Sequence, residues 1–174
     1  MSILSTKTVY TSKYFKVIQK VIKRNGNKFT KDFIERNDNV FIIPYTNDEI
    51  YLESQFRDAY GEKLLEVVGG MIEENGNPLE TAKRELLEEA GLTAKKWAKI
   101  AEWELTANIR AKMHIFAATD LEEKKQQLES DEDVQILKLK LKEVIEKVNN
   151  GEIIIASNIA ALLLFDRLRK EGKL

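Results

Sequence analysis

The fold of this chain is decided by the stretch Asn77-Pro78-Leu79-Glu80-Thr81-Ala82-Lys83-Arg84-Glu85-Leu86-Leu87-Glu88-Glu89-Ala90-Gly91. Asn77 is a favoured helix N-cap, Pro78 fits the first helical position, and Gly91 is typical of the residue that ends a helix. The apolar residues between these signals fall on one helical face: Leu79, Ala82, Leu86 and Ala90. We therefore predict an amphipathic helix over 78–90.

Three carboxylates crowd the last turns of this predicted helix. Glu85, Glu88 and Glu89 fall within an arc of about 100° next to the apolar face. They repel one another, and the C-terminal end of a helix disfavours negative charge. Arg84 offsets part of the repulsion, and a divalent cation with a preference for oxygen ligands would offset the rest. The other interpretation is a solvated acidic face.

The residues before the helix favour the metal site. Gly69-Gly70 follows the apolar run Leu64–Val68, which we predict to be a strand. Glycine permits a sharp bend and a close approach of backbone to its surroundings. A strand, a glycine bend, a loop and an acidic helix together predict a pocket floor with a free backbone carbonyl nearby.

The composition excludes several classes of protein. The chain has 174 residues, which fits one domain, and its net charge of −1 makes nucleic acid an unexpected partner. The absence of cysteine excludes disulfides and thiolate chemistry and is compatible with a cytoplasmic location. His114 is the only histidine, and we interpret it as a partly buried strand residue. No apolar run is long enough to predict a membrane span.

Turn and periodicity signals outline the remaining elements. We predict a hairpin over residues 13–35 around Asn25-Gly26, and Ser157 or Asn158 as the cap of a last helix that reaches residue 168. The segment 121–132 is predicted to be a polar loop or a short helix. Further strands are expected at 40–44, 49–55, 97–105, 113–119 and 133–139, and a short helix at 142–148. The order of elements predicts an α+β fold with a mixed sheet.

The acidic helix and the glycines before it resemble the signature of the Nudix family. The matching residues are Gly70, Arg84-Glu85-Leu86, Glu88-Glu89 and Gly91-Leu92. Gly76 stands where the family has a further glutamate. The segment Gln55-Phe56-Arg57 and the segment Leu65–Gly70 are similar to patterns of ADP-ribose pyrophosphatases and nucleotide-sugar hydrolases, with Val68 in place of the usual proline.

The resemblance implies a fold and an assembly. We expect a Nudix-like α/β/α sandwich with a mixed sheet, preceded by N-terminal antiparallel strands. Residues 1–37 would form the N-terminal arm or hairpin, and residues 38–174 one compact hydrolase domain. Such proteins are typically homodimers with exchanged N-terminal strands.

The resemblance also implies an activity and residue roles. We expect hydrolysis of the diphosphate bond of a nucleoside diphosphate sugar, with ADP-ribose giving AMP and ribose 5-phosphate, supported by Mg²⁺ or Mn²⁺. Arg84 would orient the carboxylates, and Arg57 would bind a phosphate oxygen because guanidinium offers a planar fork. Glu66 either points into the pocket or pairs with a lysine. The remaining candidates are the metal ligands Gly69 (through its carbonyl), Glu85, Glu88 and Glu89, and the general base, Glu132 or alternatively Glu129.

Other substrates and another class of function stay open. The same scaffold could act on GDP-mannose, dinucleoside polyphosphates or an oxidised nucleoside triphosphate. A non-catalytic ligand-binding module is also compatible with Gly76, although the intact glutamates of the helix argue against it. The substrate's base or sugar needs a flat apolar contact, and the candidates are Phe33, Tyr51, Phe56 and Trp103.

Overall fold

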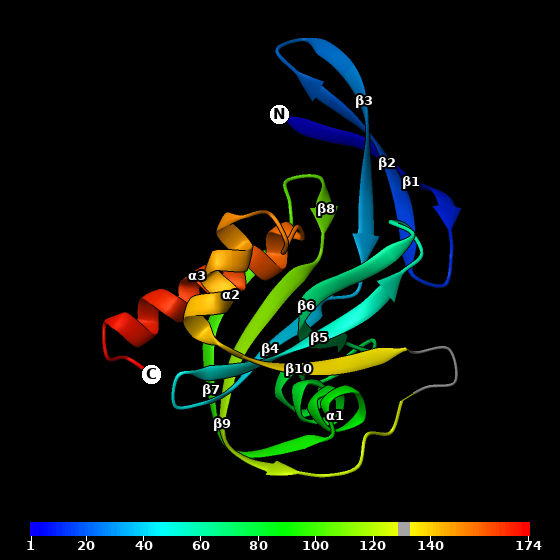
Figure 1. Ribbon diagram of the computed structural model, residues 1–174. Helices are drawn as coiled ribbons and strands as arrows, with labels where there is room; N and C mark the ends of the chain where they lie inside the picture. Colours follow the sequence, from blue (N-terminus) through cyan, green and yellow to red (C-terminus); the bar gives the residue numbers. More distant parts are fainter. Residues whose placement is uncertain (129–132) are drawn as a thin grey trace.

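A six-stranded mixed sheet forms the centre of the computed structural model, which describes residues 1–128 and 133–174 (Figure 1). The strand order is β10-β5-β6-β4-β9-β7. Strands β4 and β9 run parallel, while the pairs β10–β5, β5–β6, β6–β4 and β9–β7 run antiparallel. The strands are β4 (Asn39–Thr46), β5 (Glu49–Arg57), β6 (Glu62–Met71), β7 (Leu92–Glu104), β9 (Lys112–Glu123) and β10 (Val134–Lys140).

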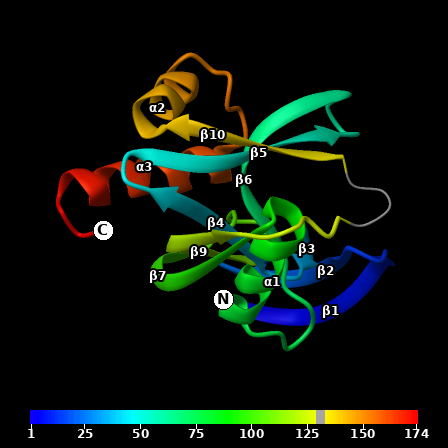
Figure 2. The same cartoon turned by 60° about the horizontal axis from the view of Figure 1, so that its bottom comes forward.

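Helices cover both faces of this sheet. Helix α1 (Pro78–Ala90) lies on one face, and α2 (Leu141–Asn149) and α3 (Ala156–Lys170) lie on the other (Figures 1 and 2). Alternation along β4 explains the two layers, because successive side chains of a strand point to opposite faces. Ile42 belongs to the core under α1, whereas Ile43 belongs to the core under α2 and α3. The predicted α/β/α sandwich with a mixed sheet is confirmed.

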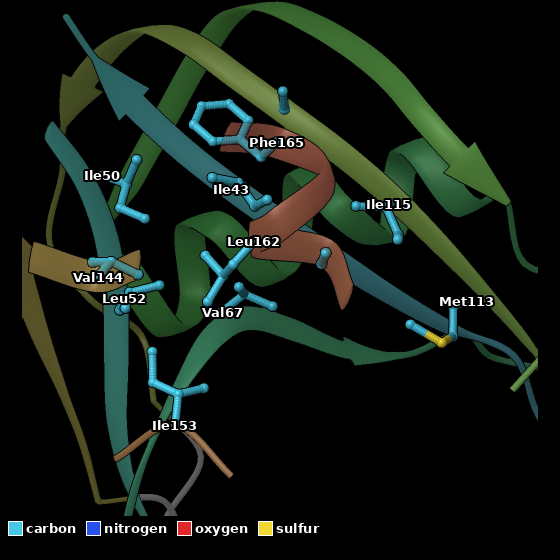
Figure 3. Packing of buried hydrophobic residues seen from close by; sticks show 12 residues of the cluster. Ile43, Ile50, Leu52, Val67, Met113, Ile115, Val144, Ile153, Leu162 and Phe165 are labelled. Atoms are coloured by element: carbon cyan, nitrogen blue, oxygen red, sulfur yellow. The ribbon is translucent and has the colours of Figure 1, made fainter. Parts of the chain in front are cut away.

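The core under α3 fixes that helix against the sheet. Figure 3 shows Leu162 and Phe165 of α3 on either side of Ile43, and all three are almost completely buried. The ring of Phe165 also meets Tyr45 edge-on, with centroids 5.1 Å apart. Burial of one such side chain contributes about 1.5–3 kcal/mol. This packing sets the position of the first turn of α3 relative to β6.

Helix α1 forms where the sequence predicts it. The Asn77 side chain accepts hydrogen bonds from the backbone N–H groups of Leu79 (2.9 Å) and Glu80 (3.2 Å). Gly91 ends the helix in the left-handed conformation, with φ of 60°. Ala82 and Leu86 are fully buried against the sheet. The N-cap, the C-terminal end and the apolar face of α1 therefore match the prediction. Together they hold the acidic face of the helix beside β6.

A second sheet is built from the N-terminal residues. It has the order β1-β2-β3-β8, with β1 (Ser2–Thr11), β2 (Phe15–Arg24), β3 (Asn27–Arg36) and β8 (Ile109–Arg110). The predicted hairpin is confirmed as β2 and β3, joined at Asn25-Gly26, both of which have positive φ. Every residue of β1 is exposed. Figure 1 shows this sheet extending away from the helices.

Two predictions of local structure need correction. The last helix begins at Ala156 and has Ile155 as its N-cap, so the prediction of Ser157 or Asn158 as the cap is wrong. Asn158 lies inside the first turn because its side chain bonds to β6 instead. Residues 121–123 complete β9, and 124–128 have no regular structure. Glu129 and Glu132 lie outside the described residues.

Within the part of the chain that the structure describes, no helix has the length and apolar character needed to cross a membrane.

Candidate active site at the junction of β6 and α1

Two glycines at the end of β6 bring the strand close to its neighbours. A Cβ atom added at Gly69 would overlap the backbone carbonyl of Val40 in β4. A Cβ atom added at Gly70 would overlap the carboxylate of Glu85 in α1. The absence of a side chain at Gly69 therefore lets β6 lie close to β4, and its absence at Gly70 lets the acidic face of α1 lie against β6.

Glu85 and Glu89 are the buried carboxylates of α1, with exposed fractions of 8% and 5%. The backbone N–H of Gly69 donates to Glu89 Oε2 over 3.3 Å. The side chain of Gln126 donates to the backbone carbonyl of Glu89 over 2.5 Å and anchors the end of the helix. Three of the predicted metal ligands, Gly69, Glu85 and Glu89, are thus neighbours at one junction.

Arg84 and Glu88 form the outer edge of this group. Arg84 Nη2 lies 2.6 Å from Glu85 Oε1, and its Nη1 bonds to Glu88. Burial lowers the pKa of Arg84, but the charges of Glu85 and Glu88 outweigh it and raise that pKa overall. The guanidinium therefore stays charged and fixes both carboxylates, which is the arrangement needed from a residue that orients ligands.

Arg57 and Glu66 lie on the neighbouring strands β5 and β6. Arg57 Nε donates to Glu66 Oε1 over 2.5 Å, so Glu66 pairs with an arginine and not with a lysine. Burial lowers the pKa of Arg57, but its hydrogen bond with Glu66 and the nearby carboxylates raise it overall. The Arg57 side chain is 39% exposed. Its Nη side can therefore still meet a ligand from solvent.

Asn158 links the C-terminal helix to this pair. Its Oδ1 accepts from the backbone N–H of Val67 over 3.1 Å, and its Nδ2 donates to Glu66 Oε2 over 3.3 Å. Asn158 is 2% exposed. The two oxygens of Glu66 are thus shared between Arg57 and Asn158, which fixes the carboxylate and, through it, the guanidinium.

Glu53 is a member of the site that the sequence analysis missed. It lies on β5 directly opposite Glu66 in the antiparallel register and is 1% exposed. Burial, followed by the proximity of Glu89, raises the pKa of Glu53 well above its ordinary value. The available signal was the alternation of Glu53, Gln55 and Arg57 along one face of a strand.

The donor set fits a hard divalent cation. The groups that converge are carboxylates with little exposure to water, and Glu53 Oε2 has no hydrogen-bond partner among the described residues. Buried carboxylates need compensation, and Mg²⁺ prefers oxygen ligands. Across residues 1–128 and 133–174, however, no three acidic or histidine side chains are already gathered at ion-binding distances. An ion would therefore have to draw Glu85 or Glu88 away from Arg84.

The remaining candidates are the histidine and four aromatic residues. His114 is a buried residue of β9, as predicted, and its ring nitrogens lie 3.3 Å from Asp38 and from Glu102. Phe33 lines a pocket of about 500 Å³ at the base of the N-terminal sheet. Of the remaining aromatic candidates, Tyr51 packs on the core under α1, and Phe56 and Trp103 are exposed.

Sequence comparisons identify relatives over almost the whole chain. The profile described as NUDIX domain matches residues 35–156. An ADP-ribose pyrophosphatase of Bacillus subtilis is 28% identical over 172 residues, which cover 93% of this chain and 93% of that protein. An ADP-ribose pyrophosphatase of Mycobacterium tuberculosis is 26% identical over 166 residues, which cover 92% of this chain and 80% of that protein.

A solved structure shares the fold. The crystal structure of an ADP compounds hydrolase superimposes with a TM-score of 0.88 at 23% sequence identity. The match covers 99% of this chain and 96% of the other. The N-terminal sheet and the sandwich are therefore both part of a known architecture.

Proposed function

This chain belongs to the Nudix family of hydrolases, and we propose that it cleaves the diphosphate bond of a nucleoside diphosphate sugar with the help of a divalent cation. ADP-ribose is the proposed substrate, in keeping with the activity that the names of the two relatives state. The observation that carries the proposal is the convergence of Gly69, Glu85 and Glu89 beside the Arg57–Glu66 pair. The site combines carboxylates that can bind a metal ion with an arginine that can bind a phosphate.

The proposed reaction consumes one water. The water oxygen bonds to one phosphorus of ADP-ribose, the bond from that phosphorus to the bridging oxygen breaks, and the products are AMP and ribose 5-phosphate. A bound Mg²⁺ or Mn²⁺ would neutralise phosphate oxygens and make the water easier to deprotonate. Glu85, Glu88, Glu89 and the Gly69 carbonyl are the proposed ligands.

The remaining roles fall to residues around the cluster. Arg84 holds Glu85 and Glu88 at the outer edge until the cation binds them. Arg57 is proposed to bind a phosphate oxygen, because Glu66 fixes its Nε and leaves the Nη groups for the substrate. Glu132, with Glu129 as the alternative, is proposed as the general base that accepts the proton of the water.

The N-terminal sheet is proposed to mediate a homodimer. Residues 1–37 form the arm in this proposal and residues 38–174 the hydrolase domain. The whole of β1 is exposed at the edge of its sheet, and such an edge favours pairing with another chain. Apolar side chains exposed on this arm include Ile3, Leu4, Val9, Tyr10, Tyr14, Phe15 and Phe29. We also propose a cytoplasmic location, with which the absence of cysteine is compatible.

A substrate panel tests the proposed function. The purified chain is incubated with ADP-ribose, GDP-mannose, a dinucleoside polyphosphate or an oxidised nucleoside triphosphate, with Mg²⁺, with Mn²⁺ or with a chelator. We expect AMP and ribose 5-phosphate from ADP-ribose in the presence of metal only. A higher kcat/KM for one of the other substrates would contradict the proposed substrate, and binding of a substrate without turnover would indicate a ligand-binding module.

A further inference from the structure

Glu53 is buried in a place where its charge has poor compensation. Its side chain is 1% exposed, and its Oε2 atom has no hydrogen-bond partner among residues 1–128 and 133–174. A buried carboxylate with incomplete hydrogen bonding is costly, because its lost hydration is only partly replaced. A carboxylate buried in this way calls for a compensating group.

The neighbours of Glu53 are mainly other carboxylates. Glu66 stands directly opposite it on β6, and like charges at opposite positions of antiparallel strands destabilise a sheet. The carboxyl group of Glu89 on α1 also interacts with Glu53. Acidic side chains from β5, β6 and α1 are therefore neighbours, although no three of them among the described residues stand at ion-binding distances.

Arg57 neutralises this group only in part. Its Nε is committed to Glu66 at 2.5 Å, whereas its Nη2 lies 3.8 Å from Glu53 Oε1. The second distance is beyond that of a hydrogen bond. One guanidinium therefore faces three carboxylates, and Glu53 interacts with it less strongly than Glu66 does.

We infer that Glu53 is a further ligand of the divalent cation and binds it together with Glu89. This inference rests on the metal dependence in the proposed function and adds a ligand from β5 to those of α1 and β6. A hard cation between Glu53 and Glu89 removes the repulsion between them and supplies the partner that Glu53 Oε2 lacks. The ion is then held from both a strand and a helix.

The competing arrangement is a neutral Glu53 that shares a proton with Glu89. Glutamine separates the two, because its amide keeps the size of the side chain and can donate to Glu89 but binds divalent cations far more weakly than a carboxylate. Glu53→Gln should weaken cation binding only if Glu53 is a ligand. The matched control is Glu49→Gln on the same strand, where Glu49 pairs with Lys138 at 2.8 Å.

The test measures binding of Mn²⁺ alone, by the loss of the free-ion signal in electron paramagnetic resonance. Wild type, Glu53→Gln, Glu49→Gln and Glu89→Gln are titrated as full chains. We expect Glu53→Gln and Glu89→Gln to weaken Mn²⁺ binding by about tenfold or more, and Glu49→Gln to bind as wild type does. Melting without metal provides the second readout: Glu53→Gln should melt no lower than wild type, and Mn²⁺ should raise its Tm less.

Three results would overturn the inference in distinguishable ways. Wild-type affinity in Glu53→Gln, with affinity lost in Glu89→Gln, would make Glu53 a neutral partner of Glu89 and leave the proposed function intact. No binding of Mn²⁺ by wild type would overturn the proposed metal dependence as well. If Glu53→Gln does not fold, Glu53→Asp replaces it, and an affinity equal to that of wild type would overturn the inference because the shorter side chain reaches less far.

Discussion

The hydrogen bonds of Asn158 predict that its substitution lowers both stability and substrate binding, although Asn158 is not proposed to touch substrate or metal. Asn158→Ala removes the acceptor of the Val67 N–H and one donor to Glu66, at 3.1 and 3.3 Å. A buried N–H without a partner costs about 1–3 kcal/mol. In a chain of this length each kcal/mol lowers Tm by about 2–4 °C, so we expect a fall of between about 2 and 12 °C.

The same substitution should change catalysis through the position of Arg57. Asn158 and Arg57 hold the two oxygens of Glu66, so a loosened Glu66 orients the guanidinium less well. A loss of about 1 kcal/mol in substrate binding corresponds to a rise in KM of about fivefold, with a smaller change in kcat. Steady-state hydrolysis of ADP-ribose and thermal melting measure the two effects.

A matched substitution and an isosteric one sharpen this test. Ser157→Ala lies in the same turn of α3 and should leave both Tm and KM unchanged. Asn158→Asp keeps an acceptor for Val67 but sets a carboxylate against Glu66, so KM should rise as it does in Asn158→Ala. A lower Tm with an unchanged KM in Asn158→Ala would refute the link from Asn158 through Glu66 to Arg57.

Three further predictions address the strand, the buried acid and the arm. Gly70→Ala should reduce hydrolysis, because its Cβ displaces the Glu85 carboxylate. Gly69→Ala should instead lower the free energy of unfolding by about 1–3 kcal/mol in denaturant titrations, because its Cβ meets the backbone of β4. Equal effects on activity and stability in the two variants would contradict this. The raised pKa of Glu53 means that its protonated form stabilises the fold below the unfolded value of 4.5 and that this stabilisation is lost as the pH rises through the folded pKa. With a chelator present, the Tm of Glu53→Gln should therefore exceed that of wild type increasingly from acid to neutral pH, and a constant difference would be inconsistent with a raised pKa. Tyr10→Glu should convert a dimer into a monomer in light scattering, whereas Ile154→Glu, at an exposed position outside the arm, should not. Identical masses for wild type and both variants would exclude the arm as the interface.

Local signals explain which parts of the fold could be predicted from the sequence. Helix α1 depends on its own cap, proline, glycine and apolar period, so its bounds follow from residues that are adjacent in the chain. The Asn25-Gly26 turn is equally local and places the hairpin correctly. The resemblance to the family added the sandwich architecture, which no short segment specifies.

The residues that the sequence analysis missed depend on distant contacts. Asn is a common helix cap, but the packing of α3 directs the Asn158 side chain towards β6, where it accepts a hydrogen bond from the buried N–H of Val67. Glu53 is a single acid in an ordinary strand pattern, and its importance comes from Glu66 and Glu89 on other elements. A cross-strand register cannot be read from one strand alone.

Hydrolysis of ADP-ribose by Glu89→Gln tests the proposed metal centre most directly. Glu89 lies on α1, accepts a hydrogen bond from Gly69 of β6 and is a proposed ligand of the cation. Its control is Glu80→Gln, since Glu80 is exposed on the same helix and pairs with Lys83. The account predicts a fall in kcat/KM of about 100-fold for Glu89→Gln with Mg²⁺ present, and wild-type values for Glu80→Gln. Full activity in Glu89→Gln, or full activity of wild type in a chelator, would contradict a metal centre at this junction.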